Sequence, residues 1–211
     1  MRKIKFVNGE FYHIYNRGTD KRVIFIDQYD FGRFLESMKE FNSVKPIGSL
    51  YENSFRDQLR PRETKLVNII AYCLNKNHFH LILEQREDGG ISNFMQKLGG
   101  GYVNYFNAQY FRTGTLFQGR FKSIHVDSNE YLLRLSAYVN LNNKVHKIKN
   151  KNFRSSWNEY VQESKNNLCK SDIILDQFKN TNEYKDFAEN SLSDILQRKA
   201  MRKEMENLLL E

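Results

Sequence analysis

Two β-prone runs separated by a short turn constrain the fold of this chain more than any other feature. The first run, residues 65–74, is almost continuously apolar, as expected of a strand buried on both faces. Asn75, Lys76 and Asn77 form a turn signal, and the second run follows from His78 to Gln85. This order predicts a β-hairpin whose first strand is deeply buried.

Further β-prone and helix-prone segments flank the hairpin. The β-prone segments are residues 11–15 and 117–126; the helix-prone segments, with apolar residues three and four apart, begin after Asp27, near Ile91 and after Asp127. Asp127 is the expected cap of the last helix, with Glu130 at the capping-box position, and we expect that helix to end near Asn142 or Asn143. The three glycines at 99–101 predict a kink or the close approach of another backbone.

The resulting order is strand, helix, strand, strand, helix, strand, helix. It fits an α+β fold, a ferredoxin/RRM-like split βαβ sandwich with an antiparallel sheet. Residues 43–65 hold both prolines and are interpreted as a loop insertion. Beyond residue 150 the pattern changes to short polar segments and a charged helix near 191–210. We therefore predict one domain over 1–150 and a C-terminal helical extension over 151–211.

The net charge of +8 is unevenly distributed. Residues 151–211 hold 10 basic and 11 acidic residues, which leaves 23 and 14 in the first 150. This excess favours a polyanionic partner, although a merely solubilising basic surface is the alternative. No apolar run is long enough to cross a bilayer, the N-terminus lacks a signal-peptide pattern, and Cys73 and Cys169 lack metal-ligand spacing. We expect a cytoplasmic protein that does not enter membranes.

The candidate chemistry begins with His78 and His80. Side chains alternate along a strand, so both imidazoles share one face while Phe79 points to the other. With hydroxyl or amide oxygens completing the shell, such a pair suits Mg²⁺ or Mn²⁺ better than structural zinc. A pair of satisfied strand histidines is the common alternative.

A tyrosine on the last predicted helix is the candidate partner of the histidine pair. Tyr138 and Asn142 are four residues apart and therefore lie on one helix face, where both could approach one metal site. Tyr131 lies about 10 Å further along the axis, so only one tyrosine could serve a given site. By counting alone, Tyr138 is one of twelve tyrosines and would more often be a packing residue.

A basic and aromatic segment precedes this helix. Residues 114–123 (GTLFQGRFKS) interleave cations with aromatic rings, a composition that suits gripping a backbone and stacking on bases. An edge strand with solvated cations is the alternative.

Together these blocks resemble the HUH single-tyrosine transposases of the IS200-like kind, particularly the REP-associated tyrosine transposases. The matching stretches run in order over most of residues 11–160: Tyr12–Gly18 (YHIYNRG), Ala71–Leu83 (AYCLNKNHFHLIL), the region 102–126 and Tyr131–Asn142 (YLLRLSAYVNLN), with a weaker match at Ser155–Trp157 and Tyr160. Asn143 stands where the family usually has proline, which we expect to loosen the helix end and the placement of Tyr138. The insertion at 43–65 is longer than the family leads us to expect.

The resemblance implies a role for each matching residue. His78 and His80 correspond to the paired metal ligands, Tyr138 to the nucleophile, and Asn142 to an auxiliary ligand. The implied activity is metal-dependent cleavage and rejoining of single-stranded or hairpin DNA through a 5′-phosphotyrosine. The basic residues that we expect to hold the DNA backbone are Arg17, Lys97, Arg120 and Lys122.

Two other functional classes remain open at this point. The same fold with aromatic residues on its sheet suits a non-catalytic module that binds single-stranded nucleic acid. A structural or regulatory protein derived from an inactive transposase is a further class. Monomer and homodimer are both compatible with the sequence, and so are a tyrosine supplied within one subunit and one supplied by a partner.

Overall fold

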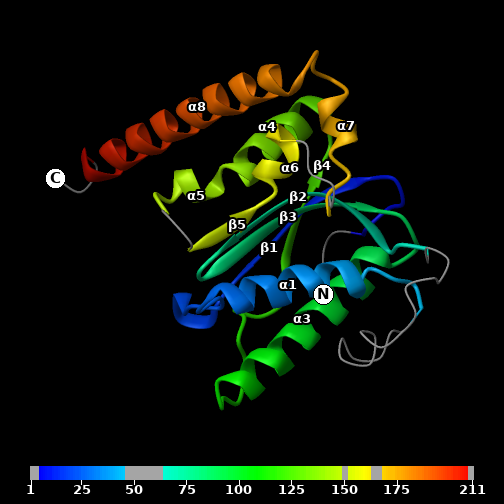
Figure 1. Ribbon diagram of the computed structural model, residues 1–211. Coiled ribbons are helices and arrows are strands. Elements are labelled where there is room, and N and C mark those ends of the chain that lie inside the picture. Colours follow the sequence, from blue (N-terminus) through cyan, green and yellow to red (C-terminus); the bar gives the residue numbers. More distant parts are fainter. Residues whose placement is uncertain (1–4, 46–63, 149–151, 163–167, 209–211) are drawn as a thin grey trace.

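The computed structural model describes residues 5–45, 64–148, 152–162 and 168–208, with residues 202–208 as backbone only (Figure 1). Most of the predicted loop insertion, residues 46–63, lies outside these ranges. Within them, no helix combines the length and the apolar character needed to cross a membrane.

A five-stranded sheet forms the centre of the molecule. Its order is β4-β1-β3-β2-β5, and every neighbouring pair is antiparallel. The strands are β1 (Phe11–Arg17), β2 (Val67–Asn75), β3 (His78–Gln85), β4 (Lys122–Val126) and β5 (Phe153–Ser155). The predicted hairpin is β2–β3, and its strands are buried along almost their whole length. The α+β fold with an antiparallel sheet is confirmed.

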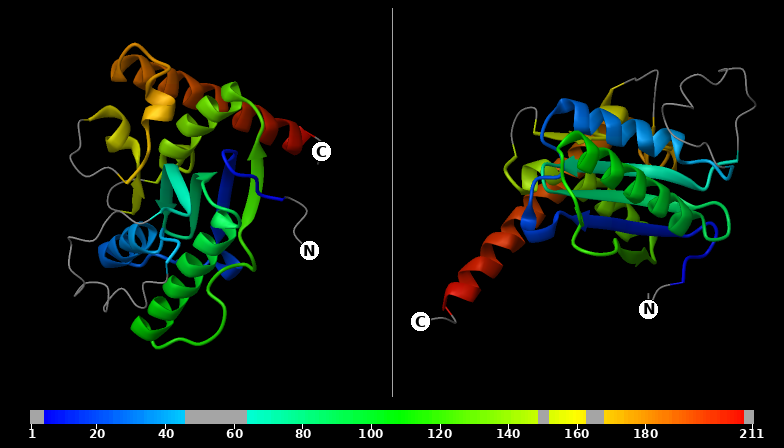
Figure 2. Two further views of the ribbon diagram at one scale, coloured as in Figure 1. Left: turned by 90° about the vertical axis from the view of Figure 1, so that its right-hand side faces the viewer. Right: turned by 90° about the horizontal axis from the view of Figure 1, so that it is seen from below.

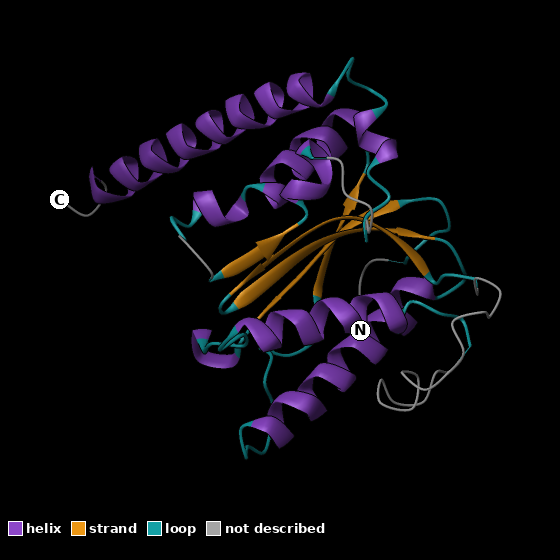
Figure 3. Cartoon of the chain, viewed as in Figure 1, coloured by secondary structure: helices purple, strands orange, loops and turns teal. Residues whose placement is uncertain are grey.

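Helices cover both faces of the sheet (Figures 1 and 3). One face carries α1 (Gln28–Glu40) and α3 (Gly90–Gln109), and the short 3₁₀ turn Thr19–Lys21 follows β1. The other face carries the remaining helices: α4 (Asn129–Asn140), α5 (Asn142–Val145), α6 (Trp157–Val161), α7 (Asp172–Leu175) and α8 (Thr181–Leu208). Alternation along β3 divides the core, because Phe79 and Leu81 pack with α1 and α3, whereas Ile82 packs with α4.

The expected extension contributes to the same architecture. Its strand β5 pairs with β2 and completes one edge of the sheet. The long helix α8 begins at Thr181, ten residues earlier than the sequence indicated, and runs alongside α4 (Figure 2). The domain boundary at residue 150 stays a prediction, but residues on both sides of it build one sheet.

Helix starts follow local capping chemistry. The helical pattern was expected to begin after Asp27, and Asp27 caps α1, because its carboxylate accepts hydrogen bonds from the backbone N–H groups of Tyr29 and Asp30. The predicted cap of α4 is wrong by one residue, since Ser128 and not Asp127 accepts from the Tyr131 N–H. A serine hydroxyl fills this role as well as a carboxylate, so composition could not distinguish two adjacent capping residues.

Two other predicted boundaries also move. The strand expected over 117–126 forms only from Lys122, while Phe117 makes an isolated bridge to Gly18. The helix expected to reach Asn142 or Asn143 ends at Asn140, and α5 starts after a break at Leu141. Tyr138 therefore lies in the last turn of α4.

The glycine triplet does not kink α3, which runs unbroken through residues 99–101. A Cβ atom on Gly101 would lie 2.7 Å from the Phe41 ring, whereas one on Gly99 or Gly100 would meet nothing within 4 Å. The close neighbour is thus an aromatic side chain beyond the end of α1, and not another backbone.

Candidate active site

The candidate site lies on the α4 side of β1 and β3. In the register of these strands Arg17 is opposite His78, and Tyr15 is opposite His80. Cross-strand partners point to the same face, so four polar or aromatic side chains line one patch of sheet. The imidazoles of His78 and His80 lie 5.3 Å apart between ring centroids, as the alternation predicts.

A chain of amide groups fixes the orientation of His78. Its Nδ1 lies 2.7 Å from the Asn77 Oδ1, and Asn77 donates its own Nδ2–H to the Lys21 carbonyl. Because an amide oxygen only accepts, His78 carries its proton on Nδ1 and has a lone pair on Nε2. The Asn75 amide donates to that Nε2 at 2.9 Å and to Asn142 Oδ1 at 2.7 Å.

His80 is held by a third imidazole. The Nδ1 of His80 lies 2.9 Å from Nε2 of His13, and both side chains are buried. The sequence reading missed His13, although the alternation of β1 places it on the same face as Tyr15. Only the register of β1 against β3 brings this residue to His80, and no local pattern encodes that register.

Burial keeps these imidazoles uncharged. It lowers the pKa of His13 to about 4. The pKa of His78 is also lowered to about 4, mainly by burial, with the nearby His146 and Arg17 contributing to the same shift. Burial also lowers the pKa of His80 well below its ordinary value, with the neighbouring imidazoles contributing. At neutral pH all three are neutral, which is the form in which an imidazole binds a cation.

Tyr138 packs against this group from α4. Its ring is half-buried and nearly perpendicular to the His80 ring, with 5.7 Å between the centroids, and it lies 6.3 Å from His13. Burial raises the pKa of Tyr138, and the nearby Asn142 side chain opposes that rise. The phenol is therefore protonated at neutral pH. Tyr131 lies in the first turn of α4, about 10 Å away along the helix axis.

Asn142 reaches the site from α5 rather than from α4. The break at Leu141 does not separate it from the histidines, because Asn142 Oδ1 lies 3.3 Å from His78 Nε2. Its Nδ2 is buried and has no hydrogen-bond partner in the part of the chain that the structure describes. Asn142 is thus a buried amide whose oxygen lies beside an imidazole lone pair.

These groups fit a divalent cation with few protein ligands. His78 Nε2 and Asn142 Oδ1 lie side by side and both accept from the Asn75 amide, and the His80 imidazole is close. A cation bound by these two atoms would take the place of the Asn75 N–H donor. Across the described ranges, no cluster of three or more His, Cys, Asp or Glu side chains could hold a metal. A set of imidazole and amide donors without a carboxylate suits an ion that completes its shell with water and phosphate oxygens.

His146 is a second histidine that the sequence reading did not single out. Its exposed ring lies 4.9 Å from that of His78, so four of the chain's five histidines gather here. Helix α8 passes close by, since Lys199 donates to the Val145 carbonyl at 3.3 Å. The cluster could not be read from the sequence because His146 follows a four-residue helix after the break.

The residues expected to hold DNA are not all near the site. Arg17 is exposed opposite His78 and donates to Gln118 Oε1, and Lys122 is exposed opposite Tyr15 on the edge strand β4. Arg120 is exposed two residues before that strand. Lys97, however, lies on α3, across the sheet, where its Nζ donates to the Ser43 carbonyl. Their roles stay predictions, and Lys97 is far from the histidines.

Comparisons with known proteins point to a family. The sequence model of the family described as "Transposase IS200 like" matches residues 51–142, which include the β2–β3 hairpin and Tyr138. No curated protein matches the chain. A solved structure described as "Structure of the REP associates tyrosine transposase bound to a REP hairpin" is 12% identical, with a TM-score of 0.51. The likeness covers 80% of this chain and 88% of that one, and it shows a shared fold.

Proposed function

We propose that this chain, whose residues 51–142 match the family model of IS200-like transposases, cuts and rejoins single-stranded DNA through a 5′-phosphotyrosine. The substrate we propose is a strand folded into a hairpin, the DNA form bound by the protein of the similar structure. The observation that supports this most strongly is the approach of one phenol, Tyr138, to His80 within a cluster of neutral imidazoles.

The reaction is an in-line displacement at phosphorus. The Tyr138 oxygen forms a bond to the phosphorus and releases its proton, while the bond from phosphorus to the 3′ oxygen breaks. That oxygen takes up a proton and leaves as a 3′-hydroxyl. The phosphodiester energy is kept in the tyrosine link, so attack by another 3′-hydroxyl reseals DNA without a nucleotide cofactor.

Each remaining residue has a separate role. His78, His80 and Asn142 would hold Mg²⁺ or Mn²⁺, and the bound ion supplies the positive charge that polarises a phosphate oxygen. Arg17 and Lys122 are exposed on the same side of the sheet and would contact flanking phosphates, which positions a strand without reading its sequence. Burial around Tyr138 limits competing attack by water.

The nucleophile acts within its own subunit. Tyr138 already lies beside His80 of the same chain, and Asn142 follows it one turn later. One subunit thus contains the phenol and the imidazole pair, and no exchange of α4 with a partner is required. A homodimer is compatible with this arrangement but is not needed for the reaction.

The test uses labelled hairpin DNA, Mn²⁺ and a denaturing gel. The wild-type protein should give a shifted covalent band, while Tyr138→Phe should give none and still bind the hairpin. Tyr29→Phe is the matched control, since the Tyr29 side chain is exposed on α1, across the sheet. His80→Ala, or chelation of the ion, should also stop cleavage.

Three results would contradict specific parts of the proposal. A covalent band with Tyr138→Phe would make Tyr131 the next candidate nucleophile. Undiminished cleavage in chelator would remove the metal from the reaction. Hairpin binding by the wild type without cleavage, across a range of hairpins, would favour the non-catalytic nucleic-acid-binding module.

A further inference from the structure

We propose that His13 is a positioning residue that sets the tautomer of His80 and thereby makes its Nε2 lone pair available to a divalent cation. The inference rests on the proposed metal-dependent function and adds a residue outside the predicted ligand set. It concerns a contact between two neighbouring strands, β1 and β3.

The contact is short and shielded from solvent. His13 and His80 are 6% and 9% exposed, and the distance from His13 Nε2 to His80 Nδ1 is 2.9 Å. The two rings are nearly parallel, at 22°, with 5.1 Å between their centroids. His13 is opposite Ile82 in the strand register, so it reaches diagonally to His80 two residues away.

Counting protons leaves two arrangements for this pair. Both imidazoles are neutral, so one hydrogen lies between His13 Nε2 and His80 Nδ1. If His13 donates it, His80 has its own proton on Nε2 and cannot bind a cation there. If His80 donates it, His80 Nε2 carries a lone pair, and His13 is protonated on Nδ1. A cation at the site requires the second arrangement.

His78 shows the same design with different groups. There the Asn77 amide oxygen accepts the Nδ1 proton and leaves the Nε2 lone pair facing Asn142. His13 would do for His80 what Asn77 does for His78. A hydrogen-bond acceptor behind each metal-binding imidazole orients the ring and fixes its tautomer, and loss of such a partner typically weakens metal affinity by about 10- to 100-fold.

Simple packing is the rival explanation of His13, because the Tyr15 ring also packs near both imidazoles. Its centroid lies 5.0 Å from that of His13 and 5.8 Å from that of His80. The two explanations differ in which substitutions are tolerated. Leucine fills the space without accepting a hydrogen bond, whereas the terminal amide of glutamine offers an oxygen where His13 Nε2 lies. A positioning role requires an acceptor, and a packing role does not.

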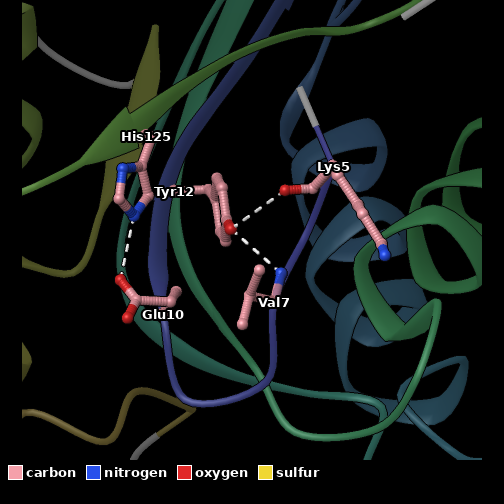
Figure 4. Close-up of polar contacts among 5 residues, drawn as sticks. All are labelled: Lys5, Val7, Glu10, Tyr12 and His125. Atoms are coloured by element: carbon pink, nitrogen blue, oxygen red, sulfur yellow. Dashed lines mark hydrogen bonds and ion pairs between the residues drawn. The ribbon is translucent and has the colours of Figure 1, made fainter. Parts of the chain in front are cut away.

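The experiment compares full-length wild type, His13→Leu and His13→Gln by Mn²⁺ titration monitored by electron paramagnetic resonance. We expect His13→Leu to weaken Mn²⁺ affinity about 10- to 100-fold and His13→Gln to stay within about threefold of wild type. The control is His125→Gln. His125 is exposed on β4, where it lies beside Tyr12 and contacts Glu10 at 2.9 Å (Figure 4). Its cross-strand partner Tyr12 packs on the α1 and α3 side of the sheet, across the sheet from the imidazole cluster.

A second measurement reads the tautomer directly in the metal-free wild-type protein. Imidazole ¹⁵N chemical shifts should show His80 protonated on Nδ1 and His13 unprotonated on Nε2. The opposite assignment overturns the proposal, and so does a Mn²⁺ affinity that His13→Leu leaves unchanged. Failure of the proposed function is separate: normal Mn²⁺ binding and the expected tautomer, with no covalent DNA adduct, would reject the reaction and leave the role of His13 intact.

Discussion

The hydroxyl of Tyr184 offers a sharp test of how the C-terminal helix α8 holds the helix that carries Tyr138. Tyr184 is fully buried, and its hydroxyl accepts from Asn140 Nδ2 at 2.9 Å and lies 3.2 Å from Ser136 Oγ. The Asn140 Oδ1 accepts in turn from Ser156 Oγ at 2.6 Å. Tyr184→Phe removes a single oxygen from this cluster and keeps the ring that packs against Tyr160.

The expected loss in the free energy of unfolding comes from the polar group that Tyr184→Phe leaves without a partner. Without the hydroxyl, the Asn140 Nδ2–H is fully buried and unpaired, and an unsatisfied buried polar group costs about 1–3 kcal/mol. The free energy of unfolding should fall by that amount. In a protein of 211 residues each kcal/mol corresponds to roughly 2–4 °C in Tm.

Urea unfolding followed by circular dichroism, in buffer with chelator, measures this change. Tyr29→Phe is the matched control, because it removes an exposed hydroxyl and should change stability by less than about 0.5 kcal/mol. A double-mutant cycle with Asn140→Leu separates the interaction between Tyr184 and Asn140 from the individual effects of the two substitutions. The double variant should cost less than the sum of the single variants by about 0.5–3 kcal/mol, since the partner left unpaired is then absent as well.

Two results would refute this reasoning. Equal stability of Tyr184→Phe and Tyr29→Phe would mean that the hydroxyl makes no net contribution to holding α8 on α4. Strict additivity in the cycle would mean that Tyr184 and Asn140 do not interact.

Three further predictions concern α3, the imidazole cluster and the subunit. Gly100→Ala should raise the free energy of unfolding by up to about 1 kcal/mol. Gly101→Ala should raise it less, or lower it, because the added Cβ meets the Phe41 ring, and urea unfolding of both variants measures the difference. In buffer with chelator, the free energy of unfolding should fall as pH drops from about 6.5 to 4, because His13 becomes protonated in the unfolded chain but not in the folded one. His13 alone should account for a loss of up to about 3 kcal/mol. Urea unfolding of His13→Gln across the same pH range should lack this loss. Mixing Tyr138→Phe with His80→Ala should not restore the covalent band, and restored cleavage would show a tyrosine acting across subunits.

Local sequence patterns predicted the parts of the fold that depend on residues close together in the sequence. The alternation through His78, Phe79 and His80 placed the imidazoles on one face, as the structure has them. The hairpin turn at 75–77 and the start of a helix after Asp27 could be predicted for the same reason. These features depend only on the spacing of apolar residues and on the residue types at turns and helix starts, which can be identified from adjacent residues.

The missed features depend on contacts distant in sequence. His13 meets His80 through a strand register, and His146 meets His78 after a helix break, so neither was visible as a motif. Lys97 looked like any other basic residue, but the topology places α3 on the opposite face of the sheet. The sequence gives the number of basic residues, but the face of the sheet on which each one lies depends on the fold.

Peptide mapping of the covalent product tests the central claim most directly. The wild-type protein is reacted with hairpin DNA and Mn²⁺, treated with nuclease and trypsin, and analysed by mass spectrometry. Trypsin separates residues 123–134, which contain Tyr131, from residues 135–144, whose single tyrosine is Tyr138. We predict a nucleotide mass on 135–144 alone. A nucleotide on 123–134, or on no tyrosine at all, would contradict the assignment of Tyr138 as the nucleophile at the imidazole cluster.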